Sequence, residues 1–134
     1  MLLKVVFDTN IFISAFIFGG NPRVCLEFAR QREIKLYTSK SILLELVFKL
    51  RHKFKLPEDD IKEIVEGIGK FAEIITPQES LAIIKTDPSD NHILEVSKEV
   101  GADYIITGDK KHILPLKKFG SAKIVTAAEF LKGT

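Results

Sequence analysis

The sequence predicts an α/β fold in which a mainly parallel sheet is covered by helices on both faces. Three observations support this prediction. Short segments rich in apolar and β-branched residues recur along the chain, segments with helical spacing of apolar residues lie between them, and helix start and stop signals flank those segments. Strands that alternate with helices of this length form βαβ units, and such units build parallel sheets.

Four segments are predicted as strands. Residues 2–7, LLKVVF, form an apolar run typical of a strand that is buried on both faces. The other three are shorter or more mixed, and they are KLYT at 35–38, ADYIIT at 102–107 and AKIV at 122–125.

Five helices are predicted between and after these strands, each from its own boundary signals. The first three are RVCLEFARQ after Asn21 and Pro22, SKSILLELVFKL with Ser39 as N-cap, and PEDDIKEIVEGIGKFA with Pro57 in its first turn. The fourth is DPSDNHILEVSKEVG, with Asp87 as N-cap, Pro88 at the first helical position and Gly101 as its stop. The fifth is TAAEFLK, with a capping box from Thr126 to Glu129.

Length and composition restrict the class of protein. The chain has 134 residues, enough for one substantial core, so residues 1–134 are predicted to form a single domain. A hydrophobic fraction of 46% excludes a generally disordered chain. The formal net charge of +2 gives no strong overall field, so any binding of nucleic acid must depend on local basic patches.

Cysteine usage and the N-terminal residues bear on location. Cys25 is the only cysteine, which excludes an internal disulfide framework and suits a reducing, intracellular setting. Asp8 interrupts the N-terminal apolar run, and no small-residue cleavage site follows, so a signal peptide is not expected. No apolar stretch approaches the roughly 18 residues of a membrane helix. These features predict a cytoplasmic protein that does not bind membranes.

Four carboxylates stand out by their positions. Asp8 ends the first strand and Asp109 follows YIITG, so both belong at the edge of a parallel sheet where ligands bind in such folds. Asp90 lies in the first turn of the helix that leads into strand 102–107, and a right-handed crossover places it near the same edge. Glu45 lies within SILLELVFKL, on a partly apolar helix face.

Such a group of acids favours a divalent metal ion. Several carboxylates within a few ångströms of one another cannot all stay ionised without a cation. A hard ion such as Mg²⁺ or Mn²⁺ prefers oxygen ligands, lowers the pKa of a bound water and clamps a phosphate group. The three histidines, His52, His92 and His112, are scattered without zinc-like spacing. No histidine cluster therefore competes with this interpretation.

Each acid also has a purely structural interpretation. Asp8 can cap the following helix, although the next threonine can do this as well, and Asp109 in TGDKK can be an ordinary turn residue. Glu45 can pair with Lys49, four residues later. An acid such as Asp90 is expected near a helix N-terminus from the dipole alone. The joint placement of the acids at one sheet edge is what favours a functional site.

The segments FDTNIFISAF, LLEL, DPSDNHILEVS and ADYIITGD together resemble the PIN domain family. More narrowly, they resemble the VapC-like PIN proteins of bacteria and archaea, the toxins of toxin–antitoxin pairs. The resemblance runs from Val5 to TAAEFL, and the D-T-N start and the T-G-D end are its specific parts. It implies a three-layer α/β/α sandwich with an acidic pocket that binds Mg²⁺ or Mn²⁺ and hydrolyses RNA. It also implies a homodimer or higher homo-oligomer and a small antitoxin that blocks the pocket.

The resemblance assigns roles to individual residues. The catalytic and metal-binding acids that it implies are Asp8, Glu45, Asp90 and Asp109. Ions held by the three aspartates activate water and stabilise charge on phosphate oxygens, with Glu45 as a ligand or a water-orienting group. The polar positions that line the pocket are Asn10 and Thr107, and Asp87 is a further candidate.

Two basic patches flank the predicted site. KLRHKFK at 49–55 leads out of the helix that carries Glu45, and KKHILPLKK at 110–118 begins beside Asp109. Because a nuclease needs cations to hold the phosphate backbone, these patches supply the candidates for RNA contact, namely Lys49, Arg51, Lys53, Lys55, Lys110 and Lys111. The alternative is that these cations only solvate the surface.

An apolar stretch follows the first strand. It contains four large apolar side chains, namely Phe12, Phe16, Ile17 and Phe18. These cannot all face the same way on a helix, so part of the stretch is predicted to be a surface that binds a partner.

The main prediction is a metal-dependent endoribonuclease that acts as a toxin, and other functions remain open. A PIN-type nuclease in RNA processing or quality control uses the same residues. A phosphatase of the haloacid dehalogenase kind needs a second acid two residues after Asp8, where Asn10 stands. A non-catalytic Mg²⁺-binding module of the receiver kind needs paired acids at the first strand, where KVVFDTN offers one.

Overall fold

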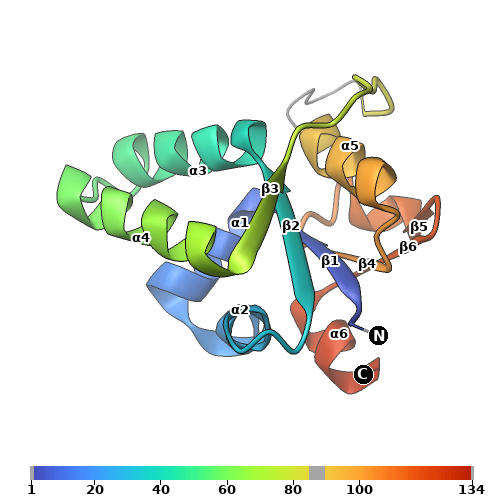
Figure 1. The fold of residues 1–134 in the computed structure, drawn as a ribbon, viewed down its shortest axis with the longest axis horizontal. Coiled ribbons are helices and arrows are strands. Elements are labelled where there is room, and N and C mark those ends of the chain that lie inside the picture. The colour runs from blue at the N-terminus through green and yellow to red at the C-terminus, as the bar shows by residue number, and fades with distance from the viewer. Residues whose placement is uncertain (1, 85–89, 134) are drawn as a thin grey trace.

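The computed structural model describes residues 2–84 and 90–133, and within them a six-stranded sheet forms the centre of the molecule (Figure 1). Its strands are β1 (Lys4–Phe7), β2 (Lys35–Ser39), β3 (Ala72–Ile75), β4 (Tyr104–Ile106), β5 (Lys118–Phe119) and β6 (Ala122–Val125).

Helices connect and cover these strands. They are α1 (Thr9–Ile13), the π-helix η1 (Ser14–Phe18), α2 (Gly20–Arg30), α3 (Lys40–His52), α4 (Glu58–Phe71), α5 (Asn91–Val100), the 3₁₀-helix η3 (Leu114–Leu116) and α6 (Ala127–Gly133).

The strand order is β3-β2-β1-β4-β6-β5, and among the strands of the described residues only β5 runs antiparallel to its neighbour. From β1 the chain builds outward through β2 and β3, and it then returns to place β4 on the other side of β1. The order therefore reverses between β1 and β4, which pair in parallel with Phe7 opposite Ile106. Open α/β sheets bind ligands at such a reversal, beyond the carboxyl ends of the strands.

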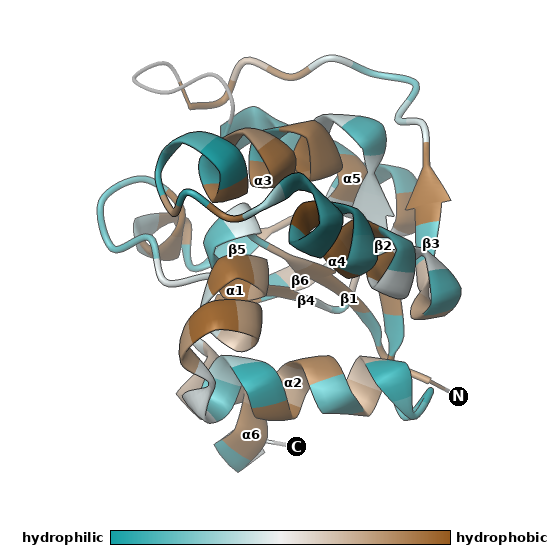
Figure 2. Ribbon diagram, turned by 90° about the vertical axis from the view of Figure 1, so that its left-hand side faces the viewer, coloured by the Kyte–Doolittle hydropathy of each residue, from teal (hydrophilic) through white to brown (hydrophobic). Residues whose placement is uncertain are grey.

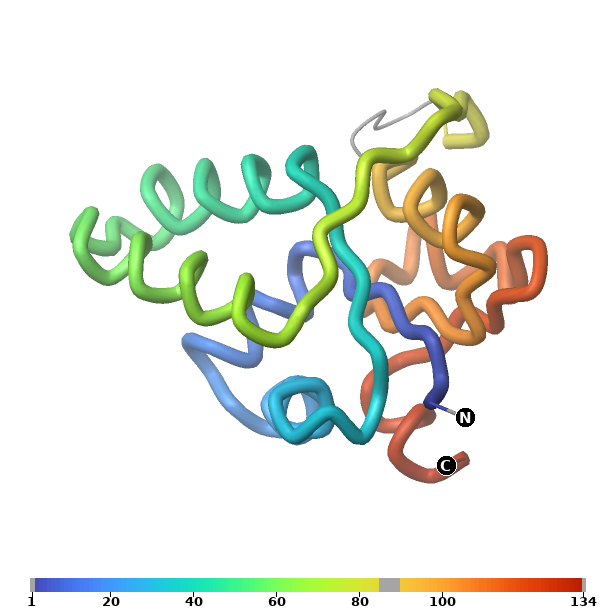
Figure 3. The backbone as a smooth tube through the Cα atoms, in the orientation of Figure 1, coloured from blue at the N-terminus to red at the C-terminus, as the bar shows by residue number. Residues whose placement is uncertain are grey.

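Helices lie on both faces of the sheet. α5 packs on β1 and β2, α2 packs against α6 on the opposite side, and α3 and α4 extend side by side beyond β3 (Figures 1 and 3). Figure 2 shows mostly hydrophobic colours in β1 and α1, whereas α2, α3, α4 and α5 alternate hydrophobic and hydrophilic residues. This pattern is that of amphipathic helices that bury one face. The largest fully buried side chains include Phe7, Phe12, Leu36, Ile42, Leu46, Leu50 and Ile105.

The four predicted strands are confirmed, with ends that differ by up to two residues from the predicted ones. Two further strands were not predicted. β3 follows α4 without an intervening loop, so the helical pattern runs directly into the edge strand. β5 has only two residues and pairs with β6 across a turn at Gly120, where φ is +58°.

Three of the predicted helix boundaries match their sequence signals, whereas α2 begins at Gly20, before the predicted start, and Pro57 is the N-cap of α4 rather than part of its first turn. Ser39 Oγ accepts the Ile42 N–H at 3.3 Å, and Gly101 ends α5 in the left-handed conformation that favours glycine. In the capping box of α6, the Thr126 N–H donates to Glu129 Oε1 at 3.0 Å, and the Glu129 N–H donates to Thr126 Oγ1 at 3.1 Å. These three signals are confirmed.

The start of α5 differs from the prediction. Asp90 occupies the N-cap position and α5 begins at Asn91, so Asp90 does not lie inside the first turn of the helix. Its side chain makes no capping bond to the helix. The predicted cap at Asp87 and the predicted first position at Pro88 lie outside the described residues.

A segment that precedes α5 is fastened along that helix. The N–H groups of Gln78, Leu81 and Ile84 donate to side chains spaced four residues apart on α5. The distances to Glu99, Glu95 and Asn91 are 2.7, 2.8 and 2.8 Å. The Asn91 amide also donates to the Ile84 carbonyl oxygen at 2.7 Å. This ladder of bonds holds residues 78–84 antiparallel to α5 and ends beside Asp90.

The apolar stretch after β1 divides between core and surface. Phe12 is fully buried and contacts Phe7, whereas 71% of Phe18 is exposed. Within the described residues, no single helix has both the length and the apolar character needed to cross a membrane. Residues Thr9–Phe18 and Gly20–Arg30 meet those criteria only when counted together, and they join at an angle of 102°.

Candidate metal centre

Asp8 is the most buried acid of the predicted site. It follows β1 directly, and its N–H donates to the Ile106 carbonyl oxygen at 3.0 Å, which extends the β1–β4 pairing by one residue. Only 4% of Asp8 is exposed. Its Oδ2 accepts the hydroxyl hydrogen of Thr107 at 2.7 Å. Asp8 occupies the N-cap position of α1 but makes no side-chain capping bond, so its carboxylate is available for another role.

Burial raises the pKa of Asp8 above its ordinary value, because a carboxylate at this position loses most of its hydration. The Thr107 hydroxyl and the nearby backbone N–H of Asn10 lower that pKa, since both favour the charged form. Repulsion by the Glu45 carboxylate raises it and attraction by the Lys49 ammonium lowers it. Burial outweighs the donors, so the ionised carboxylate is stabilised by any further cation that binds beside it.

Asp109 serves two purposes at the end of β4. Its Oδ1 accepts the N–H groups of Lys111 and His112 at 2.9 and 3.0 Å, which forms the turn that the sequence allowed for. Its own N–H donates to Thr107 Oγ1 at 3.0 Å. The second carboxylate oxygen, Oδ2, lies 3.4 Å from His112 Nδ1. The turn therefore uses one oxygen and leaves the other facing the site.

The side chain of His112 lies between the carboxylates of Asp90 and Asp109. His112 Nδ1 lies 3.4 Å from Asp90 Oδ2, the same distance that separates it from Asp109 Oδ2. Asp90 comes from the N-terminus of α5 and Asp109 from the turn after β4, so His112 links two elements. All three side chains are partly buried.

Glu45 approaches from the opposite side, on α3. Its Oε2 accepts the Thr9 hydroxyl hydrogen at 2.9 Å, and its Oε1 lies 3.4 Å from Lys49 Nζ. The same ammonium donates to Asn10 Oδ1 at 3.3 Å. The predicted pairing of Glu45 with Lys49 is thus present, and it occurs at the site rather than away from it.

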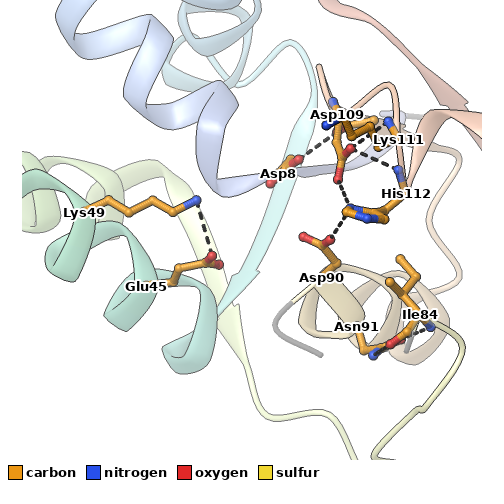
Figure 4. Close-up of polar contacts among 10 residues, drawn as sticks. Asp8, Glu45, Lys49, Ile84, Asp90, Asn91, Asp109, Lys111 and His112 are labelled. Atoms are coloured by element: carbon orange, nitrogen blue, oxygen red, sulfur yellow. Dashed lines mark hydrogen bonds and ion pairs between the residues drawn. The ribbon is translucent and has the colours of Figure 1, made fainter. Parts of the chain in front are cut away.

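The structure brings the four predicted acids to one edge of the sheet. Figure 4 shows their carboxylates, from β1, α3, α5 and the turn after β4, directed toward a common region. The contacts described above connect them: Thr107 joins Asp8 to Asp109, and His112 joins Asp109 to Asp90. Glu45 is joined through the threonine next to Asp8.

The donor atoms fit a divalent cation. One ligand atom each from Asp90, Asp109 and His112 can be chosen so that all three lie within 4.8 Å of one another. In an octahedral site with bonds of about 2.1 Å, neighbouring ligands are roughly 3 Å apart and opposite ones roughly 4 Å. The spacing of the three side chains approaches these values. Asp8 and Glu45 border this group, so the tightest donor set differs from the four acids expected from sequence.

Two residues of this network were not identified from the sequence. His112 lacks zinc-like spacing to the other histidines, and the sequence pattern indicates only a helix-capping role for Thr9. The signal for His112 is its position three residues after Asp109. An Asx-type turn at Asp109 brings residues at that spacing back toward the aspartate. Thr9 is fully buried beside Asp8, where a hydroxyl must find a partner.

The predicted RNA-contacting cations differ in their surroundings. Arg51 makes three hydrogen bonds to the Glu58 carboxylate, at 2.7 to 3.1 Å, and Lys53 lies 5.7 Å from the ring centre of Phe54. Lys49 is engaged at the site itself. The four that are exposed and lie in turns or loops are Lys53, Lys55, Lys110 and Lys111.

Solved structures with this fold include chains of VapBC complexes. The Salmonella typhimurium VapBC complex bound to DNA contains a chain that matches 94% of this chain and 99% of its own length, with a TM-score of 0.65 and 16% identity. The Rickettsia felis VapBC2 complex, bound to a DNA fragment from its promoter, contains a chain that matches with a TM-score of 0.64 and 14% identity, over 91% and 97% of the two chains. At these identities the match establishes a common fold.

Sequence comparison identifies the family. The uncharacterized protein MJ1680 of Methanocaldococcus jannaschii is 38% identical over 113 residues, which are 81% of this chain and 72% of that protein. A family model described as "PIN domain" matches residues 4–111, a range that contains Asp8, Glu45, Asp90 and Asp109. Together with a mainly parallel sheet whose order reverses at Asp8, this match shows that the chain belongs to the PIN domain family.

Proposed function

We propose that this protein is a metal-dependent endoribonuclease with Asp8, Glu45, Asp90 and Asp109 as its acidic centre. The observation that carries the proposal is the meeting of these side chains, from four separate elements, where the strand order reverses. Asp8 is buried there with a raised pKa, and a bound cation would stabilise its ionised form and lower that pKa. A divalent ion at this position supplies a bound water of lowered pKa and neutralises charge on phosphate oxygens.

The protein side chains have distinct roles in this proposal. Asp8, Asp90 and Asp109 hold the Mg²⁺ or Mn²⁺ ion, and Thr107 fixes the orientation of Asp8 through its hydrogen bond. Glu45 is a further ligand or orients the attacking water from the α3 side. Asn10, which is exposed and accepts a hydrogen bond from the Lys49 ammonium, lines the site in this proposal.

Substrate binding is assigned to cations that border the acids. Lys110 and Lys111 are exposed directly after Asp109, where they can hold the phosphates of an RNA strand. Lys53 and Lys55 extend this contact beyond α3. Lys49 and Arg51 contribute less to binding in the free protein, because Glu45 and Glu58 already pair with them.

A cleavage assay tests the proposal. End-labelled single-stranded RNA, and DNA of the same sequence, is incubated with protein and Mn²⁺, Mg²⁺ or EDTA. We expect internal cleavage of RNA with either ion, none with EDTA, and a loss of at least about a hundredfold in Asp8→Asn. Glu63→Gln, which removes an exposed carboxylate of α4, is the matched control and should cleave normally. Cleavage that persists in Asp8→Asn or in EDTA would reject the mechanism.

We further propose that the protein is the toxin of a type II toxin–antitoxin pair in the cytoplasm. The support is the family membership and the fold shared with chains of VapBC complexes. Induced expression of the wild type should arrest growth, and expression of Asp8→Asn to the same level should not. If both proteins are harmless, a role in RNA processing or quality control is favoured over the toxin role.

Partner binding is also proposed. A small antitoxin that covers the acidic centre and self-association into a homodimer or higher oligomer are expected. The exposed apolar side chains available for such contacts include Phe18, Leu44 and Phe48. Light scattering during size-exclusion chromatography measures the oligomeric state. A Phe18→Ser variant that elutes as a smaller species would assign Phe18 to the interface between copies.

A further inference from the structure

We propose that His112 is itself a ligand of the divalent ion and that its imidazole makes the centre prefer Mn²⁺ to Mg²⁺. This inference rests on the proposed metal-dependent function and deepens it by assigning a nitrogen donor and an ion class. It concerns a residue outside the four acids from which the function was argued.

The position of His112 supports a role as ligand. Its Nδ1 lies 3.4 Å from one carboxylate oxygen of Asp90 and 3.4 Å from one of Asp109. These are close to the roughly 3 Å separations of neighbouring ligands around an ion with bonds of about 2.1 Å. A small movement of the three side chains is enough to bring them around one cation.

The backbone also holds His112 in this orientation. Its N–H donates to Asp109 Oδ1 at 3.0 Å, so the turn that positions the acid positions the imidazole too. The side chain is 28% exposed and faces the acids, as Figure 4 shows. The same carboxylate thus presents Oδ1 to the turn and Oδ2 to the site, next to Nδ1.

The other two histidines do not share these surroundings. His52 lies at the end of α3, exposed, with its ring 4.5 Å from that of Phe48. The Nδ1 atom of His92 is buried and has no hydrogen-bond partner among the described residues. His52 is therefore a suitable control for the loss of an imidazole elsewhere on the surface.

Ligand chemistry determines which ion such a set selects. Mg²⁺ prefers oxygen ligands and gives up its waters reluctantly, whereas first-row transition ions accept imidazole nitrogen readily. Adding the His112 imidazole to the carboxylates of Asp8, Asp90 and Asp109 gives a mixed set of oxygen and nitrogen ligands, which suits Mn²⁺ better than Mg²⁺. If His112 only donated a hydrogen bond to the acids, it would orient them without this preference.

Pulsed electron paramagnetic resonance of bound Mn²⁺ tests the assignment in the intact chain. Protein labelled with ¹⁵N only in histidine should show ¹⁵N hyperfine coupling to Mn²⁺, and the coupling should disappear in His112→Asn and persist in His52→Asn. Asparagine can keep a hydrogen bond to the acids but removes the imidazole. Circular dichroism and thermal unfolding establish that each variant is folded.

Competition measurements provide the second readout. We expect Mn²⁺ to bind the wild type at least about tenfold more tightly than Mg²⁺, and His112→Asn to weaken Mn²⁺ binding about tenfold. Mg²⁺ affinity should change less than about threefold. Bound Mn²⁺ without ¹⁵N coupling in the wild type, or equal loss of both affinities in His112→Asn, overturns the inference.

These outcomes are separate from those of the cleavage assay. RNA cleavage by a protein that shows no ¹⁵N coupling would reject His112 as a ligand and retain the nuclease function. Coupling in a protein that cleaves no RNA would reject the nuclease function and retain His112 as a metal ligand.

Discussion

A single hydroxyl group, that of Thr107, organises the two acids that end β1 and β4. Its Oγ1 donates to Asp8 Oδ2 at 2.7 Å and accepts the Asp109 N–H at 3.0 Å. The side chain is fully buried, so water cannot replace either bond without rearrangement. The Asp8 carboxylate and the backbone of Asp109 are therefore held by one oxygen atom.

Replacing Thr107 with valine, which has nearly the same shape, removes that oxygen atom. We expect Thr107→Val to lower the free energy of unfolding by about 1–3 kcal/mol, because the Asp109 N–H and the Asp8 carboxylate both lose a partner. Chemical denaturation measures the change. Thr107→Ser keeps the hydroxyl, and its cost should be near 1 kcal/mol, from the lost methyl group. A valine variant as stable as the serine variant would show that the hydroxyl has no such importance.

The raised pKa of Asp8 predicts how stability depends on pH. In the unfolded chain the pKa of Asp8 is near 3.8, and in the folded state it is higher, so the folded state binds the carboxyl proton more tightly. Protonation of Asp8 therefore stabilises the fold at low pH. That stabilisation is lost as the pH rises from 3.8 through the raised pKa. Without metal at neutral pH, Asp8→Asn should therefore be more stable than the wild type.

The difference between the two proteins should shrink as the pH falls, since both then carry an uncharged group at position 8. Parallel denaturation of wild type and variant in EDTA at several pH values measures it. Glu63→Gln removes an exposed carboxylate and should show no comparable gain. A variant less stable than the wild type at neutral pH would contradict the dominance of burial.

At the scale of elements, α5 is the helix whose placement matters most for the site. It packs on β1 and β2, its N-cap is Asp90, and three of its side chains fasten residues 78–84 along its length. Asn91 makes two of these hydrogen bonds with Ile84, one as acceptor and one as donor. Because Asn91 is next to Asp90, the segment and the acid share one anchor.

Changing Asn91 to aspartate keeps the size of the side chain and removes its donor. The carboxylate would face the Ile84 carbonyl oxygen at a position that is 3% exposed, so we expect a loss of at least about 2 kcal/mol in unfolding free energy. Metal affinity should fall as well, because Asp90 shifts with the start of α5. Glu99→Gln keeps an acceptor for the Gln78 N–H at an exposed position and should stay within about 0.5 kcal/mol of the wild type. Equal stability of both variants would exclude a special role for Asn91.

At the scale of the whole molecule, sequence patterns were sufficient to place the acids that end strands. Parallel strands must bring Asp8 and Asp109 to the same edge, and each helix that carries Glu45 or Asp90 begins at that edge because it follows a strand or precedes one. Such placement depends only on strand direction and element order.

What the sequence could not provide is the detail set by turns and packing. The contact of His112 with two acids depends on the fold of the turn after Asp109, and the approach of Glu45 to Thr9 depends on how α3 packs on α1. The sequence pattern does not predict β3 because the residues at its centre are exposed and because α4 leads into it without a break. These features arise from tertiary contacts rather than local patterns.

Metal binding should couple the elements that the fold brings together. The candidate ligands come from β1, α3, α5 and the turn after β4, so an ion that binds only the folded state stabilises all of them at once. At a concentration about one hundred times the dissociation constant, Mn²⁺ should raise the free energy of unfolding by about 2.7 kcal/mol. Denaturation with Mn²⁺ and with EDTA measures this gain.

Asp109→Asn provides the sharpest comparison for that coupling. Asparagine keeps an oxygen for the N–H groups of Lys111 and His112, so the turn is retained, but the negative charge that faces the ion is lost. We expect the metal-free variant to be folded and to gain less than about 1 kcal/mol from Mn²⁺. Hydrogen exchange should show that Mn²⁺ slows amide exchange at the ends of β1 and β4 and the N-termini of α3 and α5 together in the wild type. Protection confined to the turn after β4 would mean that the ion binds Asp109 alone and that the four elements do not act as one site.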